Sequence, residues 1–140
     1  MDFILRGDLE GLERLIDNGL DVNKIEGHFE GETLIYAAIY EADAKAAKLL
    51  LERGANPNVV DSSSSSPLHT AVSEAIVNYF HFEMDYIPVI EVLLDYGADP
   101  DIKNRFGESA RQMAVVNQLS NIIELFDRSC GTTTKPALRK

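Results

Sequence analysis

The chain has 140 residues, of which 45% are hydrophobic and 26% charged, and its formal net charge at pH 7 is −10. These values suit one soluble globular domain with its own core. No apolar run reaches the roughly 18 residues that a membrane span needs, and the opening MDFILRGDLE lacks the basic flank of a secretory signal. A single cysteine, Cys130, lies beyond the last helical pattern and excludes an internal disulfide framework, so we expect a reducing, cytoplasmic location.

Two kinds of segment recur along the chain at predicted helix boundaries. One kind ends a helix and occurs as LIDNGLDVN (15–23), LLERGANPN (50–58) and LLDYGADPD (93–101). The other begins a helix and occurs as GETLIYAA (31–38), SSSPLHTA (64–71) and GESARQMA (107–114). The beginnings lie 33 and then 43 residues apart, so the second interval equals the first plus an insertion of ten. Such a period predicts stacked repeats, each too small to bury its own apolar face.

The residue types at these boundaries favour pairs of helices. A hydroxyl residue that can cap the first helix stands at the start of each pair: Thr33, Ser66 and Ser109. Apolar residues follow at helical spacing in the second helices: Ala46, Ala47, Leu49 and Leu50; Val89, Ile90, Val92 and Leu93; Ile122, Ile123, Leu125 and Phe126. A glycine that can adopt the left-handed conformation then ends the helix: Gly19, Gly54 and Gly97.

Together, the 33-residue period, the PLHTA stretch (67–71) and the three glycine exits resemble the ankyrin repeat. The resemblance covers residues 1–127 and implies an all-α solenoid of stacked helix-turn-helix units with short β-hairpin loops. The repeats would be 1–24, 25–58, 59–101 and 102–127, with the first and last as caps. Residues 128–140 would form a flexible basic tail. Leu34 and Ala110 replace the family's usual proline, and Ser64 replaces its turn glycine.

The insertion of ten residues lies between the two helices of the third repeat, around residues 76–86, and it is rich in aromatic side chains. We expect it to extend the first helix and then to turn back into the stack at Pro88. Its aromatic residues could pack on the back of the stack. Alternatively, they could protrude as a contact element that includes Phe80, Phe82 and Glu83.

The resemblance also implies where a partner would bind. Ankyrin domains usually grip another protein with the concave face that hairpin tips and first helices form. The register places these residues on that face: Phe29, Glu30, Glu32, Tyr40, Glu41, Ser62, Ser63, Ser65, Ser73, Glu74, Arg105, Phe106 and Glu108. Phe29 and Phe106 would be aromatic anchors unless either ring folds back onto a neighbouring hairpin.

The acidic charge is concentrated in one part of the chain. No lysine or arginine occurs between Arg53 and Lys103, and eight acidic residues do: Asp61, Glu74, Glu83, Asp85, Glu91, Asp95, Asp99 and Asp101. A surface of this sign repels nucleic acid and anionic lipid, and it attracts a basic partner. We therefore expect a protein partner with a basic contact surface, and neither nucleic acid nor membrane. The alternative is a solvated surface that maintains solubility.

The residues give no support to catalysis. His28, His69 and His81 are scattered, no His/Cys pair has metal-ligand spacing, and no glycine-rich phosphate loop is present. The resemblance gives His69 a structural role in supporting a hairpin. We therefore predict a chain without enzymatic activity, metal or cofactor.

A small acidic binding domain, monomeric by itself, suggests an inhibitor that neutralises its partner, for example an immunity-type inhibitor of a toxin. Two alternatives stay open because one fold hosts many functions. The chain could be an adaptor or scaffold that recruits one protein to another, or a structural subunit of a larger complex.

Overall fold

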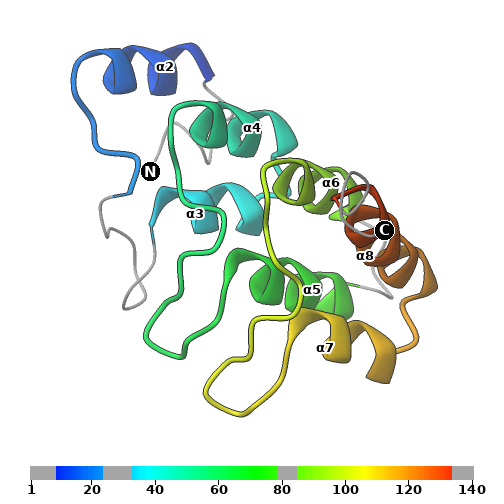
Figure 1. The fold of residues 1–140 in the computed structure, drawn as a ribbon. Helices are drawn as coiled ribbons and strands as arrows, with labels where there is room; N and C mark the ends of the chain where they lie inside the picture. The colour runs from blue at the N-terminus through cyan, green and yellow to red at the C-terminus, as the bar shows by residue number, and fades with distance from the viewer. Residues whose placement is uncertain (1–8, 24–32, 79–84, 134–140) are drawn as a thin grey trace.

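The computed structural model describes residues 9–23, 33–78 and 85–133, and in these residues it has seven helices arranged in two rows (Figure 1). The inner row consists of α3 (Leu34–Tyr40), α5 (Pro67–Val77) and α7 (Ala110–Val116). The outer row consists of α2 (Leu9–Asp17), α4 (Ala44–Glu52), α6 (Ile87–Asp95) and α8 (Ser120–Thr133). Helices contact their neighbours within each row, and each inner helix contacts the outer helix that follows it. In the described ranges, β structure does not go beyond isolated bridges, such as that between Lys103 and Ser109. The predicted all-α repeat fold is confirmed.

Two of the three predicted helix caps are confirmed. The Ser66 and Ser109 hydroxyls accept hydrogen bonds from the backbone amides of the third residue of their helices. In return, the Ser66 and Ser109 backbone amides donate to the side chains of His69 and Gln112. The prediction for Thr33 is wrong, because its side chain makes no capping hydrogen bond. The Tyr36 amide, which would donate to a capping side chain, donates instead to the Thr33 backbone carbonyl at 3.1 Å. The Tyr36 hydroxyl lies within hydrogen-bond distance of the distant Val59 and Ser65 carbonyls.

The helix exits have the predicted backbone geometry. Gly19, Gly54 and Gly97 have φ angles of +107°, +100° and +93°, in the region that favours glycine. Ser64, which stands where the family usually has glycine, also has a positive φ of +59°. This serine therefore adopts a conformation that costs an L-residue free energy.

The strained conformation of Ser64 leads to a first prediction. We expect Ser64→Gly to raise the free energy of unfolding by about 0.5–1 kcal/mol and the melting temperature by about 2–5 °C. Thermal denaturation followed by circular dichroism measures the change. Ser62→Gly is the matched control, because Ser62 belongs to the same loop but is not among the residues with positive φ. An equal gain in both variants would contradict this explanation.

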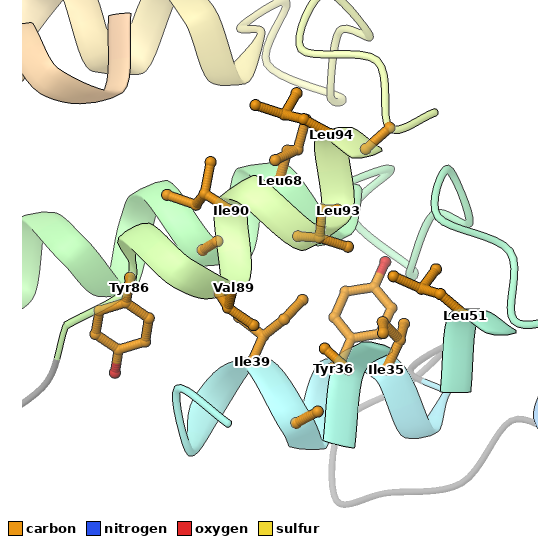
Figure 2. Close-up of a cluster of buried hydrophobic side chains, with 14 of the residues drawn as sticks. Ile35, Tyr36, Ile39, Leu51, Leu68, Tyr86, Val89, Ile90, Leu93 and Leu94 are labelled. Carbon is orange, nitrogen blue, oxygen red and sulfur yellow. The ribbon is translucent and has the colours of Figure 1, made fainter. Parts of the chain in front are cut away.

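The core lies between the two rows of helices. Ile39 and Tyr36 of α3 face Val89 and Leu93 of α6, so side chains of successive repeats interlock (Figure 2). The predicted core is confirmed: Ala46, Ala47, Leu50, Val89, Ile90, Leu93, Ile122, Leu125 and Phe126 are buried, and Leu49, Val92 and Ile123 are partly buried against them.

The helix-exit segments also connect neighbouring repeats. The Asn23 side chain donates to the Gly54 carbonyl (3.0 Å) and accepts from the Asn56 amide (2.8 Å). Asn58 makes the equivalent pair of bonds one repeat further on, with Gly97 (3.0 Å) and Asp99 (2.7 Å). These asparagines satisfy backbone groups at the helix exits and fix the spacing of the repeats.

A different arrangement closes the far end of the stack. The Arg111 guanidinium bonds to the carboxylates of Asp101 and Asp127, each at 2.8 Å, and lies 5.8 Å from the centre of the Phe126 ring. Helix α8 continues to Thr133, past the predicted domain boundary at Asp127, and its backbone includes Cys130, which the sequence analysis placed beyond the last helix. The division into a repeat domain and a tail stays a prediction.

The inserted segment follows the prediction as far as it is described. Helix α5 has 11 residues whereas α3 and α7 have 7, and α6 begins at Ile87 with Pro88 in its first turn. Tyr86 is buried, with 3% of its surface exposed. Residues 79–84, including Phe80, Phe82 and Glu83, lie outside the described residues, so the choice between a packed and a protruding segment stays open. In the described part of the chain, no helix combines the length and apolar character needed to cross a membrane.

Candidate functional site

A groove of about 290 Å³ opens on the side of the inner helices and the hairpin loops. The groove brings together residues of α3, α5 and α7 and of the two hairpins between them: Tyr40, Asp61, Ser63, Ser65, His69, Thr70, Ser73, Glu74, Asn104, Phe106, Glu108 and Met113. The concave-face prediction named several of these: Tyr40, Ser63, Ser65, Ser73, Glu74, Phe106 and Glu108. Residues more than sixty positions apart in the sequence thus share one surface. Their role in binding stays a prediction.

The remaining predicted residues do not line this groove. Glu41 caps the end of α3 and is half-buried, Ser62 is exposed on the hairpin, and Arg105 is exposed beside Phe106. The others lie outside the described residues: Phe29, Glu30, Glu32, Phe80, Phe82 and Glu83.

Both hairpins that form the rim of the groove are held by side-chain acceptors. The Asp61 carboxylate accepts from the Ser63 (2.8 Å) and Ser65 (3.0 Å) amides, which explains why a run of serines keeps a defined turn. The Asn104 side chain does the same for the Phe106 (2.9 Å) and Glu108 (3.1 Å) amides. The Arg105 amide then donates to the Ser63 carbonyl at 3.2 Å, so the two hairpins form one continuous edge.

His69 connects the base of this edge to the helices. Its Nδ1 accepts from the Ser66 amide (3.0 Å), so Nε2 carries the proton and donates to the Glu108 carbonyl (2.8 Å). The ring is almost completely buried, with 3% exposed. This geometry agrees with the structural role that the resemblance implied. Although His69 lines the groove, both of its ring nitrogens bond to the backbone.

The acidic wall of the groove is centred on Glu74. Its carboxylate is half-buried, and this burial raises its pKa, while a hydrogen bond with the buried Tyr86 hydroxyl acts in the opposite direction. Burial also raises the pKa of Tyr86, as do the nearby Glu74 and Glu41 carboxylates. A fixed carboxylate therefore faces the groove. Among the described residues, the lining includes two further acids, Asp61 and Glu108, but no lysine or arginine.

Phe106 forms the aromatic tip of the second hairpin. It is 74% exposed, so its ring does not fold back onto a neighbouring hairpin as the alternative prediction allowed. The Arg105 guanidinium lies 5.6 Å from the ring centre, within the range of a cation–π contact. Aromatic anchors inside a polar rim are a feature that protein interfaces use.

Sequence reasoning missed the contribution of α7 to the concave face. Tyr40, Ser73 and Val116 each stand seven residues after the N-cap of an inner helix, so they occupy equivalent positions in successive repeats. Val116 is 79% exposed, and Met113, one turn earlier, lines the groove. The signal was present in the sequence, because the register that identified Tyr40 and Ser73 also identifies Val116.

The chain forms a two-row stack of helix pairs, with hairpins projecting to one side and an open groove beneath them. This arrangement defines a helical repeat protein of the kind that binds other macromolecules. The family model for ankyrin repeats (3 copies) matches residues 1–104. The chain therefore belongs to the ankyrin-repeat family, whose members are typically non-enzymatic modules for protein–protein interaction.

Several curated proteins are similar over shorter or longer stretches. A putative ankyrin repeat protein of Acanthamoeba polyphaga mimivirus is 40% identical over 80 residues, which are 56% of this chain and 17% of that protein. One from Rickettsia bellii is 32% identical over 114 residues, which are 81% of this chain and 31% of that protein. Mouse protein phosphatase 1 regulatory subunit 27 is 27% identical over 126 residues, which are 90% of this chain and 74% of that protein. The chain thus spans less than a third of the first two relatives.

Proposed function

We propose that this chain binds a protein with a basic contact surface through its concave groove, and that this binding inhibits or neutralises the partner. The observation that carries the proposal is the exposed Phe106 ring at the rim of a groove with an acidic wall. Interfaces typically centre on aromatic anchors inside a polar rim. The absence of lysine and arginine between Arg53 and Lys103 adds charge complementarity to a basic partner.

Inhibition and recruitment differ in the number of contact surfaces that they require. An inhibitor needs one contact surface that covers a functional site of its partner, whereas an adaptor needs two surfaces that can be occupied together. The similarity to a protein phosphatase 1 regulatory subunit, of which this chain covers 74%, supports a regulatory role over a purely structural one. An immunity-type inhibitor of a toxin in the cytoplasm would be one example.

The proposal predicts that loss of the aromatic side chain speeds dissociation. We expect Phe106→Ala to raise the dissociation rate of a partner captured from the native cell by about tenfold or more, because anchors act after encounter. Tyr96→Ala is the matched control, since Tyr96 is 37% exposed but lies at the end of the outer helix α6. Surface-based binding kinetics measure both variants.

An assay of the captured partner's own activity separates the two functions. Complete loss of that activity when the chain is added in equal amount supports inhibition, and unchanged activity supports recruitment. If Phe106→Ala and Tyr96→Ala dissociate at the wild-type rate, the concave groove is not the binding surface and the proposal fails.

A further inference from the structure

The two ends of the concave groove differ in chemistry. The end formed by the third repeat carries the half-buried Glu74 carboxylate and lies in the part of the chain without bases. The end formed by the fourth repeat carries the apolar side chains of Phe106 and Met113, and Phe106 is among the most exposed large hydrophobic groups in the described residues. A ligand that fits both ends must therefore carry a positive charge at one place and an apolar side chain at another.

Arg105 in the fourth repeat determines which end of the groove accepts the positive charge of the ligand. The Arg105 guanidinium already lies over the Phe106 ring, so a second cation at this end would meet charge repulsion. The Glu74 carboxylate, by contrast, is held in place through its hydrogen bond with Tyr86 and is partly removed from water. An ion pair with such a carboxylate is stronger than one between fully solvated groups.

The spacing of the two ends follows from helix packing. Glu74 belongs to α5 and Met113 to α7, and these helices are neighbours in the inner row (Figure 1). Packed helices lie about 8–10 Å apart, and an extended chain advances about 3.3 Å per residue. An extended segment that crosses the two helices therefore passes from one end of the groove to the other in about three residues.

We propose that the groove binds an extended segment of the partner in which a lysine or arginine and a bulky apolar residue are separated by two residues, with the base at Glu74 and the apolar side chain against Phe106 and Met113. This inference rests on the proposed function and specifies the sequence that the groove selects.

Short synthetic peptides test the inference directly. The first probe is a twelve-residue glycine/serine peptide that contains Arg-Ser-Ser-Leu, and it is titrated into the full ¹⁵N-labelled chain while amide shifts are recorded by NMR. Three further probes replace the arginine by glutamate, replace the leucine by serine, or separate the two residues by six serines. We expect the first peptide to shift the amides of Ser73, Glu74, Phe106 and Met113, and to bind at least about threefold more tightly than each of the others.

Two variants of the chain link this selectivity to the groove. Glu74→Gln removes the charge but keeps an acceptor for the Tyr86 hydroxyl, and we expect it to weaken binding of the first peptide at least about threefold. Glu91→Gln is its control, because Glu91 is an exposed acid on the outer helix α6, and we expect no change. Phe106→Ala should reduce the advantage of leucine over serine.

Several results would overturn the inference. They are the absence of amide shifts in groove residues at millimolar peptide concentration, equal affinity for the four peptides, and an equal loss of affinity in Glu74→Gln and Glu91→Gln. These results differ from a failure of the proposed function, in which Phe106→Ala leaves the dissociation of the captured partner unchanged. Peptides that do not bind, together with a partner that depends on Phe106, would reject only the segment proposed here.

Discussion

Replacing Leu50 by alanine should lower the free energy of unfolding by about 2–5 kcal/mol. Leu50 is completely buried in α4, and this helix contacts α2, α3 and α6, which belong to three repeats. Truncation removes apolar transfer energy and leaves a cavity that the stack can fill only by shifting a whole helix. Urea denaturation followed by circular dichroism at 222 nm measures the change in free energy, which for a small domain is a large part of the total.

Leu15→Ala is the matched control for this prediction. Leu15 begins the first helix-exit segment just as Leu50 begins the second, but it is 42% exposed. We expect this variant to cost less than about 1 kcal/mol, because burial and not the motif sets the penalty. A similar cost for both variants would show that α2 and α4 are packed equally, contrary to the structure. A cost below about 1 kcal/mol for Leu50→Ala would mean that the register of the second repeat is wrong.

Much of the fold could be predicted from the sequence because its main determinants are local or periodic. A glycine at each helix exit is needed for a left-handed φ, so the residue types alone located the exits at Gly54 and Gly97. The apolar pattern of the outer helices identified the buried residues, and the 33-residue period indicated the stacking. Such signals depend on neighbours within about one helical turn or on the repeat itself.

The remaining features depend on contacts between elements that are far apart in the sequence. The Tyr36 hydroxyl of the second repeat bonds to the Ser65 carbonyl in the next hairpin, which a local pattern could not predict. The bond between Glu74 and Tyr86 spans the insertion, so no repeat pattern predicted it. The closure of the stack by Arg111 over Phe126 likewise joins α7 to α8. Tertiary contacts decide such details, and local propensity does not.

The prediction with the largest kinetic effect concerns the charge of the groove. We expect the double variant Glu41→Lys/Glu108→Lys to associate about tenfold or more slowly with a basic partner at low salt, because surface charge steers encounter. Glu108 is exposed on the groove rim, and Glu41 lies next to the groove residue Tyr40. Glu74 is unsuitable for reversal, since a lysine there would leave the buried Tyr86 hydroxyl without its carboxylate acceptor.

Glu91→Lys/Asp95→Lys is the control, because it changes the net charge by the same amount on the outer helix α6. Stopped-flow association at two salt concentrations compares the variants with the wild type. The groove variant should lose most of its salt dependence, whereas the control should keep most of it, since a local field falls off within about a Debye length of 8–10 Å. Equal slowing of both variants would show that only net charge matters. If neither variant slows association, the acidic residues act in solubility and the partner is not selected by its positive charge.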